Sequence, residues 1–113
     1  METRMAASEH EEKTFDFPGM TVNMQTREVF VNGSHVYLTA KEFDILALLI
    51  EHPKQIFSPA EIYECVWKTN AIRNDARAVM VYISTLRKKI ESGDEPKYIL
   101  NIRRVGYKFN HHL

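Results

Sequence analysis

The 113-residue sequence has little cysteine and no long apolar run. Its only cysteine, Cys65, excludes an internal disulfide framework and fits a reducing cytoplasm. The longest apolar run, FDILALLI, is interrupted by Asp44 and is far shorter than the ~20 residues that span a bilayer. The first residues, METRMAASEHEEK, lack the apolar centre of a signal peptide. We therefore expect one globular domain that neither spans a membrane nor depends on disulfides.

Catalytic and metal-binding patterns are also missing. No Ser-His-Asp or Cys-His arrangement, glycine-rich phosphate loop or paired-carboxylate motif stands out. The histidines have no metal-ligand spacing with Cys65, and residues 111–113, which include His111 and His112, are predicted to be a tail. Cys65 lies beside the apolar Ile62 and Val66, so we expect a small packed hydrophobe there. The sequence predicts no enzyme, no metal site and no cofactor.

The formal net charge is zero, but the charges are segregated along the chain. Residues 1–14 contain two basic and four acidic side chains, and residues 15–67 contain three basic and seven acidic ones. Residues 68–113 contain ten basic and four acidic side chains, which gives this part a net charge of +6. Such an asymmetry predicts a polyanionic partner for the C-terminal part. The alternative is a dipolar surface that binds nothing.

Residues 15–38 are predicted to form a small antiparallel sheet, because they alternate in short segments rich in Val, Phe and Tyr. Asn32-Gly33 stands between EVFV and HVYL. A type I′ hairpin turn needs two residues that tolerate positive φ, which this pair supplies. Residues 1–14 are polar without apolar periodicity, and we expect a linker or an expression remnant there.

Three helices are predicted next. TAKE is a capping box in which Thr39 caps the helix and Glu42 reaches back, and SPAE repeats the signal with Ser58, Pro59 and Glu61. The side chains expected in the core from the first helix, which ends at His52-Pro53, are Phe43, Leu46, Ala47, Leu49 and Ile50. The second, shorter helix carries Ile62, Tyr63, Val66 and Trp67.

The third helix is expected to begin at Asn74 or Asp75 and to run to Ser92-Gly93. At about 100° per residue, an apolar stripe forms one side; it consists of Val79, Ile83, Leu86 and Ile90. The opposite side collects Asn74, Arg77, Val81, Ser84, Thr85 and Lys88, flanked by Met80, Tyr82, Arg87 and Lys89. No residue between Arg77 and Lys89 is acidic, although solvated helices usually interleave both signs.

This pattern predicts an anionic partner for the third helix. Arg and Lys neutralise phosphates, and Ser and Thr form hydrogen bonds with phosphates or base edges. A helix fits the major groove of DNA. The end of the chain, YILNIRRVGYKFN, predicts two short strands around a basic tip near Arg103 to Gly106. An arginine at such a tip suits a minor groove. Two short helices, a basic helix and a basic hairpin together describe a helix-turn-helix with a wing.

Four segments resemble the effector domain of the OmpR/PhoB-type response regulators. They are LTAKEFDILALLIEHP, FSPAEIYECVW, VMVYISTLRKKIE and ILNIRRVGYKF, and their order and spacing match across roughly residues 15–110. The resemblance implies an α+β winged helix-turn-helix, with an N-terminal antiparallel β-sheet of four strands, a three-helix bundle and a C-terminal β-hairpin wing. It also implies a bacterial, cytoplasmic output module of a two-component system.

The resemblance further implies how the domain works. The third helix, about residues 74–91, would read the major groove, and the wing, about 98–109, would approach the minor groove. Protomers would bind promoter direct repeats as tandem dimers, while the domain alone would be a monomer. The receiver domain is absent from this sequence, which suggests the effector half of a longer protein. The loop KTNAIRN (68–74) corresponds to a segment that touches RNA polymerase in some members.

The positions that match the family's DNA-contacting residues lie on the third helix, the wing and the end of the second helix. They are Arg77, Tyr82, Ser84, Thr85, Arg87, Lys88, Asn101, Arg103, Arg104, Tyr107 and Trp67, and Val81 lies on the same side of the helix. The sequence departs from the family where Tyr82 replaces a frequent His and Thr85 a basic residue. Arg104 stands at the usual wing Gly, and Met80 replaces a common Asp.

Arg77, Thr85, Lys88 and Arg103 are the strongest candidate contacts; for each the alternative is a solvated surface position. Arg87 can instead form an ion pair with an acidic residue of the first helices. Trp67 and Tyr107 are expected mainly at the edge of the core, with a secondary phosphate contact. The alternative function is a protein-interaction module that binds an acidic protein or polymerase alone. RNA is disfavoured, because the major groove of A-form RNA excludes a helix.

Overall fold

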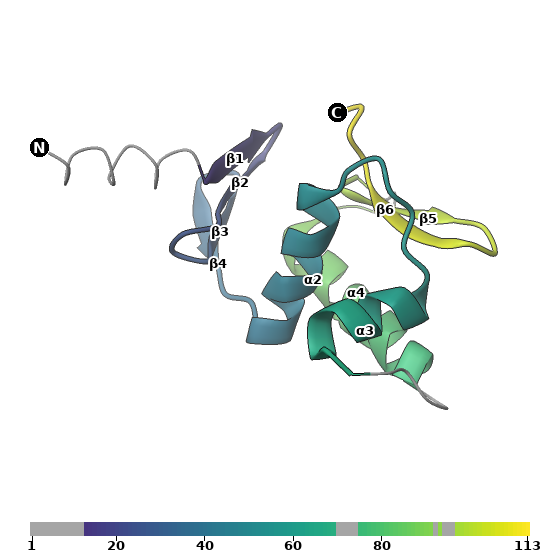
Figure 1. The fold of residues 1–113 in the computed structure, drawn as a ribbon. Helices are drawn as coiled ribbons and strands as arrows, with labels where there is room; N and C mark the ends of the chain where they lie inside the picture. The colour runs from purple at the N-terminus through teal and green to yellow at the C-terminus, as the bar shows by residue number, and fades with distance from the viewer. Residues whose placement is uncertain (1–12, 70–74, 92, 94–96) are drawn as a thin grey trace, which may run out of the picture. The chain divides into compact units, whose positions relative to one another are not determined.

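The computed structural model describes residues 13–69, 75–91, 93 and 97–113, in which four strands are followed by three helices and two further strands (Figure 1). The chain divides into two compact units, Met1–Tyr37 and Leu38–Leu113. Within the described residues, no helix combines the length and the apolarity that crossing a membrane would require.

The first unit contains an antiparallel sheet in the order β1-β2-β3-β4. Its strands are β1 (Thr14–Phe17), β2 (Met20–Asn23), β3 (Glu28–Val31) and β4 (Ser34–Val36). Val31 pairs with Ser34 across the β3–β4 turn, where Asn32 and Gly33 have φ values of 51° and 85°. Positive φ at both central residues is what a type I′ turn requires. The predicted sheet and its Asn-Gly hairpin are confirmed.

Both predicted capping boxes open helices of the second unit. In α2 (Ala40–Glu51) the Glu42 N–H donates to Thr39 Oγ1 over 3.2 Å, and the Thr39 N–H donates to Glu42 Oε1 over 2.9 Å. In α3 (Pro59–Trp67) Ser58 and Glu61 make the same exchange over 3.1 and 2.8 Å. These bonds satisfy amides that the first turn of a helix leaves without intrahelical partners.

The third helix, α4 (Asp75–Ile90), buries the predicted apolar stripe completely. Val79, Ile83, Leu86 and Ile90 are each at most 1% exposed. The helix ends at Ile90, before the predicted stop at Ser92-Gly93. Asp75 is its first residue, and Asn74 lies outside the described residues. Helices α3 and α4 pack against each other, and α2 packs against both.

Two burial predictions on α2 and α3 are wrong. Cys65 is exposed: with Ile62 and Val66 both facing the core, it lies about 100° from Val66 around the helix and outside the buried sector. Ala47 is only half-buried, whereas Ile45, which the sequence analysis left out, is fully buried. The buried side of helix α2 is therefore as wide as expected but rotated by about 40°, toward Ile45 and away from Ala47.

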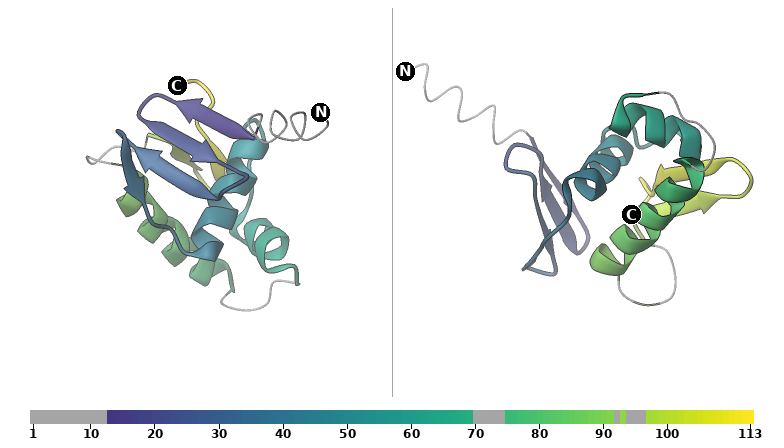
Figure 2. Two further views of the ribbon diagram at one scale, coloured as in Figure 1. Left: turned by 90° about the vertical axis from the view of Figure 1, so that its left-hand side faces the viewer. Right: turned by 90° about the horizontal axis from the view of Figure 1, so that it is seen from below.

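The predicted wing is confirmed as the hairpin β5 (Ile99–Ile102) and β6 (Gly106–Phe109). It extends past the helices in Figure 1 and lies beside α4 in the right-hand view of Figure 2. Phe57 and Tyr107 exchange two backbone hydrogen bonds of 2.8 Å, so the segment before α3 fixes β6. This bridge places the wing next to the N-terminus of α3.

Candidate nucleic-acid interface

The exposed side of α4 combines cations with small hydroxyl side chains. Its exposed residues are Arg77, Met80, Val81, Ser84, Thr85 and Lys88. Met80 is 50% and Val81 60% exposed, which shows that neither belongs to the core. Asp75, in the first turn, is the only acidic residue of this helix, at the end where the helix dipole favours a negative charge. The rest of this side can therefore approach an anion without repulsion.

Lys89 faces α2. Its Nζ atom lies 2.7 Å from Glu42 Oε1, and the Glu42 side chain is only 4% exposed. Burial by itself would raise the pKa of the Glu42 carboxyl, but the hydrogen bonds from Lys89 and Thr39 and the charge of Lys89 outweigh it. The pKa of Glu42 is therefore lowered from its ordinary value of 4.5. This pair joins the end of α4 to the start of α2.

Arg87 faces the wing. Its Nη2 donates to the Ile99 carbonyl oxygen over 2.6 Å and to Asn101 Oδ1, and its Nε lies 3.9 Å from Glu91 Oε1. The prediction that its alternative partner belongs to the first helices is wrong, because Glu91 follows α4 itself. Residues 87 and 89 lie about 200° apart on a helix, so only one of the two can face α2. That residue is Lys89.

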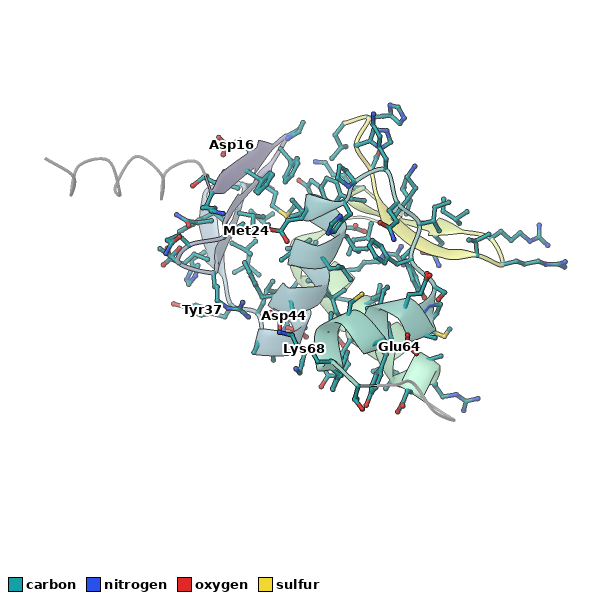
Figure 3. All side chains as sticks on the ribbon, in the orientation of Figure 1. Asp16, Met24, Tyr37, Asp44, Glu64 and Lys68 are labelled. Atoms are coloured by element: carbon teal, nitrogen blue, oxygen red, sulfur yellow. The ribbon has the colours of Figure 1, made fainter. Side chains whose placement is uncertain are left out.

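The tip of the wing is basic and exposed. Arg103, Arg104 and Val105 form the turn, and nitrogen-tipped side chains extend from it in Figure 3. Arg104 has a φ of 66°, a left-handed conformation that glycine adopts more readily. Met80 of α4 lines a shallow hollow of about 290 Å³ together with wing residues 101–107 and Pro59. The wing tip and the exposed side of α4 thus border one surface.

Two of the wing's candidate contacts have partners inside the protein. Asn101 is exposed, but its Oδ1 accepts the hydrogen bond from Arg87. Tyr107 is 7% exposed, and the Arg87 guanidinium lies 5.8 Å from its ring centroid. The expectation that Tyr107 packs at the core is confirmed, and the ring is too enclosed to serve as an open stacking platform.

Trp67 belongs to an aromatic cluster at the end of α3. Its ring stacks on Tyr63 at a centroid distance of 4.7 Å and meets Tyr82 edge-on at 5.2 Å. Trp67 is half-buried, as expected for packing at the edge of the core, and Tyr82, a predicted DNA contact, is half-buried as well. The sequence analysis missed Lys41, whose Nζ lies 5.3 Å from the Trp67 ring and 3.4 Å from the Val66 carbonyl oxygen.

Only the first part of the 68–74 loop lies within the described residues. Lys68 ends α3 in a left-handed conformation, and its N–H donates to the Glu64 carbonyl oxygen over 2.9 Å (Figure 3). Lys68 and Thr69 are both exposed. Residues 70–74 lie outside the described part of the chain, so the expected polymerase contact there stays a prediction.

The candidate residues therefore fall into two groups. Those with exposed side chains are Arg77, Val81, Ser84, Thr85, Lys88, Arg103 and Arg104. Those held by contacts within the protein are Trp67, Tyr82, Arg87, Asn101 and Tyr107. The first group offers cationic donors for phosphates and hydroxyl groups for base edges or phosphates. The second group gives the surface its shape.

Comparison with known proteins agrees with this architecture. A family model described as "Transcriptional regulatory protein, C terminal" matches residues 33–109. The uncharacterized transcriptional regulatory protein YclJ of Bacillus subtilis is 45% identical over 91 residues, which cover 80% of this chain and 39% of YclJ. The chain thus spans about two fifths of the length of that relative.

Two solved structures have the same fold. The DNA-binding domain of RstA from Klebsiella pneumoniae, crystallised in complex with the RstA box, gives a TM-score of 0.76 at 33% identity. The match covers 86% of this chain and 96% of that domain. DrrB of Thermotoga maritima, an OmpR/PhoB homologue, gives a TM-score of 0.77 at 29% identity, over 95% of this chain and 49% of DrrB. The chain belongs to the family of C-terminal domains of transcriptional regulatory proteins, of the OmpR/PhoB type.

Proposed function

We propose that this chain is the output domain of a bacterial two-component response regulator, which acts in the cytoplasm and controls transcription by sequence-specific binding of double-stranded DNA. The main support is the exposed side of α4, where Arg77, Ser84, Thr85 and Lys88 face outward with no acidic residue between Arg77 and Lys89. The helix would lie in the major groove, and Arg103 and Arg104 of the wing would reach the minor groove.

The side chains of α4 suit different parts of a duplex. Arg77 and Lys88 would neutralise phosphates, and Ser84 and Thr85 would contact base edges or phosphates. Val81, which is 60% exposed between them, would contact the C5-methyl group of a thymine. Trp67 and Tyr107, which are largely packed, would add at most a phosphate contact through their polar atoms.

The proposal extends to partners other than DNA. A receiver domain on the full-length protein would control the output domain, and the loop 68–74 would be a candidate contact with RNA polymerase. Tandem protomers would bind direct repeats, while the isolated chain would be a monomer. The boundaries of the DNA-binding domain are proposed at residues 15 and 110.

Selection from random duplexes tests this function. The chain is incubated with a random pool, the bound duplexes are sequenced, and the enriched duplex is titrated at several salt concentrations. We expect an enriched direct repeat with half-sites about one helical turn apart. If about five phosphates are neutralised per protomer, log affinity should fall against log salt with a slope of roughly −4 to −5.

A protein-interaction module is the second candidate, and the exposed Met80 and Val81 favour it, because apolar side chains support protein contacts. Failure to bind any duplex at low salt, together with retained binding to purified RNA polymerase or to another acidic protein, would reject DNA binding in favour of this candidate. Salt-sensitive binding without enrichment would show that the surface contacts phosphates but that the isolated domain reads no sequence.

A further inference from the structure

Arg87 is the basic residue of α4 that makes its polar contacts with the wing, whereas Lys89 pairs with Glu42 of α2. Arg77 and Lys88 are exposed, whereas the Arg87 side chain is only 22% exposed. Its Nη2 is bonded to two acceptors on β5, the Ile99 carbonyl oxygen and Asn101 Oδ1. The Nη2 donors are therefore used within the protein, and Nε is buried beside Glu91 Oε1, which leaves only the Nη1 donors for a phosphate.

Glu91 completes the connection from the other side. One of its oxygens, Oε1, lies 3.9 Å from Arg87 Nε, and the other, Oε2, accepts the N–H groups of Tyr98 and Ile99 over 2.9 and 3.0 Å. The Glu91 side chain is 6% exposed. One carboxylate therefore joins the end of α4 to the first residues of β5, and hydrogen bonds to a charged group are about twice as strong as neutral ones.

The two side chains hold the wing at three places. Glu91 binds the backbone where β5 begins, Arg87 binds β5 at Ile99 and Asn101, and the Arg87 guanidinium lies 5.8 Å from the ring of Tyr107 on β6. On the second strand, β6, the bridge between Phe57 and Tyr107 fixes the wing at the residue that pairs with Asn101. The angle between the wing and α4 therefore depends on contacts made by the last turn of α4.

We propose that Arg87 and Glu91 form a clamp that sets the position of the wing relative to α4, and that Arg87 is a positioning residue and not a phosphate ligand. The inference rests on the proposed function, because α4 and the wing must reach two grooves of one duplex at the same time. Fixing their relative position before binding removes an ordering cost from association.

Charge-conserving substitution separates the two roles. Arg87→Lys keeps the positive charge but loses the fork that binds Ile99 and Asn101, and Arg87→Met removes both. A positioning role predicts that both variants lose affinity for the selected duplex by a similar factor, about tenfold. At Arg77, which is the matched exposed control, Lys should retain most of the affinity that Met loses. Near-complete rescue by Arg87→Lys would overturn the proposal.

A double-mutant cycle asks whether Arg87 acts through the wing. If the clamp positions the wing, Arg103→Ala should weaken binding in the wild type but have little further effect on Arg87→Lys. Additive losses would mean that Arg87 contacts the duplex independently of the wing, which contradicts the clamp. All variants are compared at a temperature where thermal unfolding shows them to be folded.

Hydrogen exchange tests the clamp without DNA. The amides of residues 98–109 should exchange at least about tenfold faster in Arg87→Lys and Arg87→Met, while the amides of α2 and α3 keep wild-type rates. Unchanged wing exchange would overturn the proposal. Faster wing exchange in a protein whose wild type binds no duplex would support the clamp and overturn the proposed DNA binding instead.

The wild-type complex provides a test that needs no substitution. In NMR spectra of the wild-type chain, the Arg87 guanidinium signals should stay close to their free positions when the duplex is added, because Ile99 and Asn101 remain its acceptors. A scalar coupling between an Arg87 nitrogen and a DNA phosphorus would identify a phosphate ligand and reject the positioning role. This result does not depend on whether any variant folds.

Discussion

Of Gly33, Gly93 and Gly106, Gly106 has the least room for a side chain. A Cβ atom there would lie 2.0 Å from the Phe57 carbonyl oxygen and 2.6 Å from its carbon, and the residue has a φ of +158°. Gly106→Ala must therefore displace the backbone that carries the Phe57–Tyr107 bridge. We expect it to lower the free energy of unfolding by about 2 kcal/mol or more. Urea unfolding followed by circular dichroism measures this.

Gly33 provides the matched control, since it also has a positive φ, +85°, but an added Cβ would meet nothing within 4 Å. Gly33→Ala should cost only the backbone strain of a left-handed alanine, about 1 kcal/mol. Equal losses at the two positions would show that conformation alone, and not the contact with Phe57, explains why glycine is needed at 106.

The Glu42–Lys89 pair makes stability depend on pH. Because the pKa of Glu42 is lowered in the folded state, ionised Glu42 stabilises the fold above its ordinary value of 4.5, and this stability is lost as pH falls through the folded pKa. Glu42→Gln keeps the capping box, since Gln also suits that position. We expect this substitution to lower the free energy of unfolding by about 1 kcal/mol at pH 7. The loss is small because the Lys89 side chain is 33% exposed and solvent screens the pair.

The pH profile distinguishes the ion pair from a packing effect. The difference in unfolding free energy between wild type and Glu42→Gln should shrink as pH falls below about 4.5, when the wild-type carboxyl becomes protonated. Lys89→Met should show the same convergence. A difference that stays constant from pH 7 to pH 3 would assign the loss to packing. Denaturant titrations at each pH supply the measurement.

At the scale of single elements, local signals in the sequence account for most of the fold. Thr39 with Glu42 and Ser58 with Glu61 lie within one helical turn, so their capping bonds follow from sequence spacing alone. The burial of Val79, Ile83, Leu86 and Ile90 follows from helical periodicity. The Asn32-Gly33 turn follows from conformational preference.

The contacts that the sequence did not predict join elements that are distant in the chain. Lys89 pairs with Glu42, 47 positions away, and Arg87 bonds to Asn101, 14 positions away. Helical periodicity places both on the flanks of the basic side, but it gives only the angle of a side chain and not the residue that it meets there. Cys65 is a different case: the prediction of a packed side chain rests on its apolar neighbours in the sequence, whereas helical periodicity places it about 100° from Val66 and outside the buried side.

Two exposed residues of α4 should differ in the kind of binding energy that they contribute. Arg77→Ala should weaken binding to all duplexes alike and reduce the steepness of the salt slope by about 1, because it removes a phosphate contact. Thr85→Ala should cost about 1–3 kcal/mol on the selected duplex and much less on random DNA. Fluorescence anisotropy on both duplexes at several salt concentrations makes the comparison.

Exposed Lys68, on the C-cap of α3, helps to interpret these variants. Lys68→Ala removes one positive charge that lies outside the exposed side of α4. We therefore expect it to reduce the affinity for DNA less than Arg77→Ala does. If neither Arg77→Ala nor Thr85→Ala changes affinity for any duplex, the proposed docking surface is wrong. If Lys68→Ala weakens binding as much as Arg77→Ala, Lys68 approaches the DNA phosphate backbone as closely as α4 does.

At the scale of the whole molecule, the net charge is zero, but the segregation of charge along the chain is what matters for binding. The net charge of +6 on residues 68–113 is balanced by acidic residues elsewhere in the chain. Long-range attraction to DNA depends on the total charge at low ionic strength, where the Debye length is ~30 Å. At physiological salt it falls to ~8 Å, and the basic surface acts locally. The acidic residues should therefore affect how fast DNA is found more than how tightly it is held.

Residues 1–12 allow the effect of the acidic residues on the association rate to be tested. They contain four acidic residues and one basic residue, a net charge of −3. Deleting them leaves a chain of net charge +3, which should associate with DNA a few-fold faster at about 10 mM salt, with the advantage disappearing above about 150 mM. Replacing Glu2, Glu9, Glu11 and Glu12 by Gln in the full chain should have the same effect. An acceleration produced only by the deletion, and independent of salt, would mean that the segment obstructs the surface sterically; stopped-flow fluorescence distinguishes the two cases.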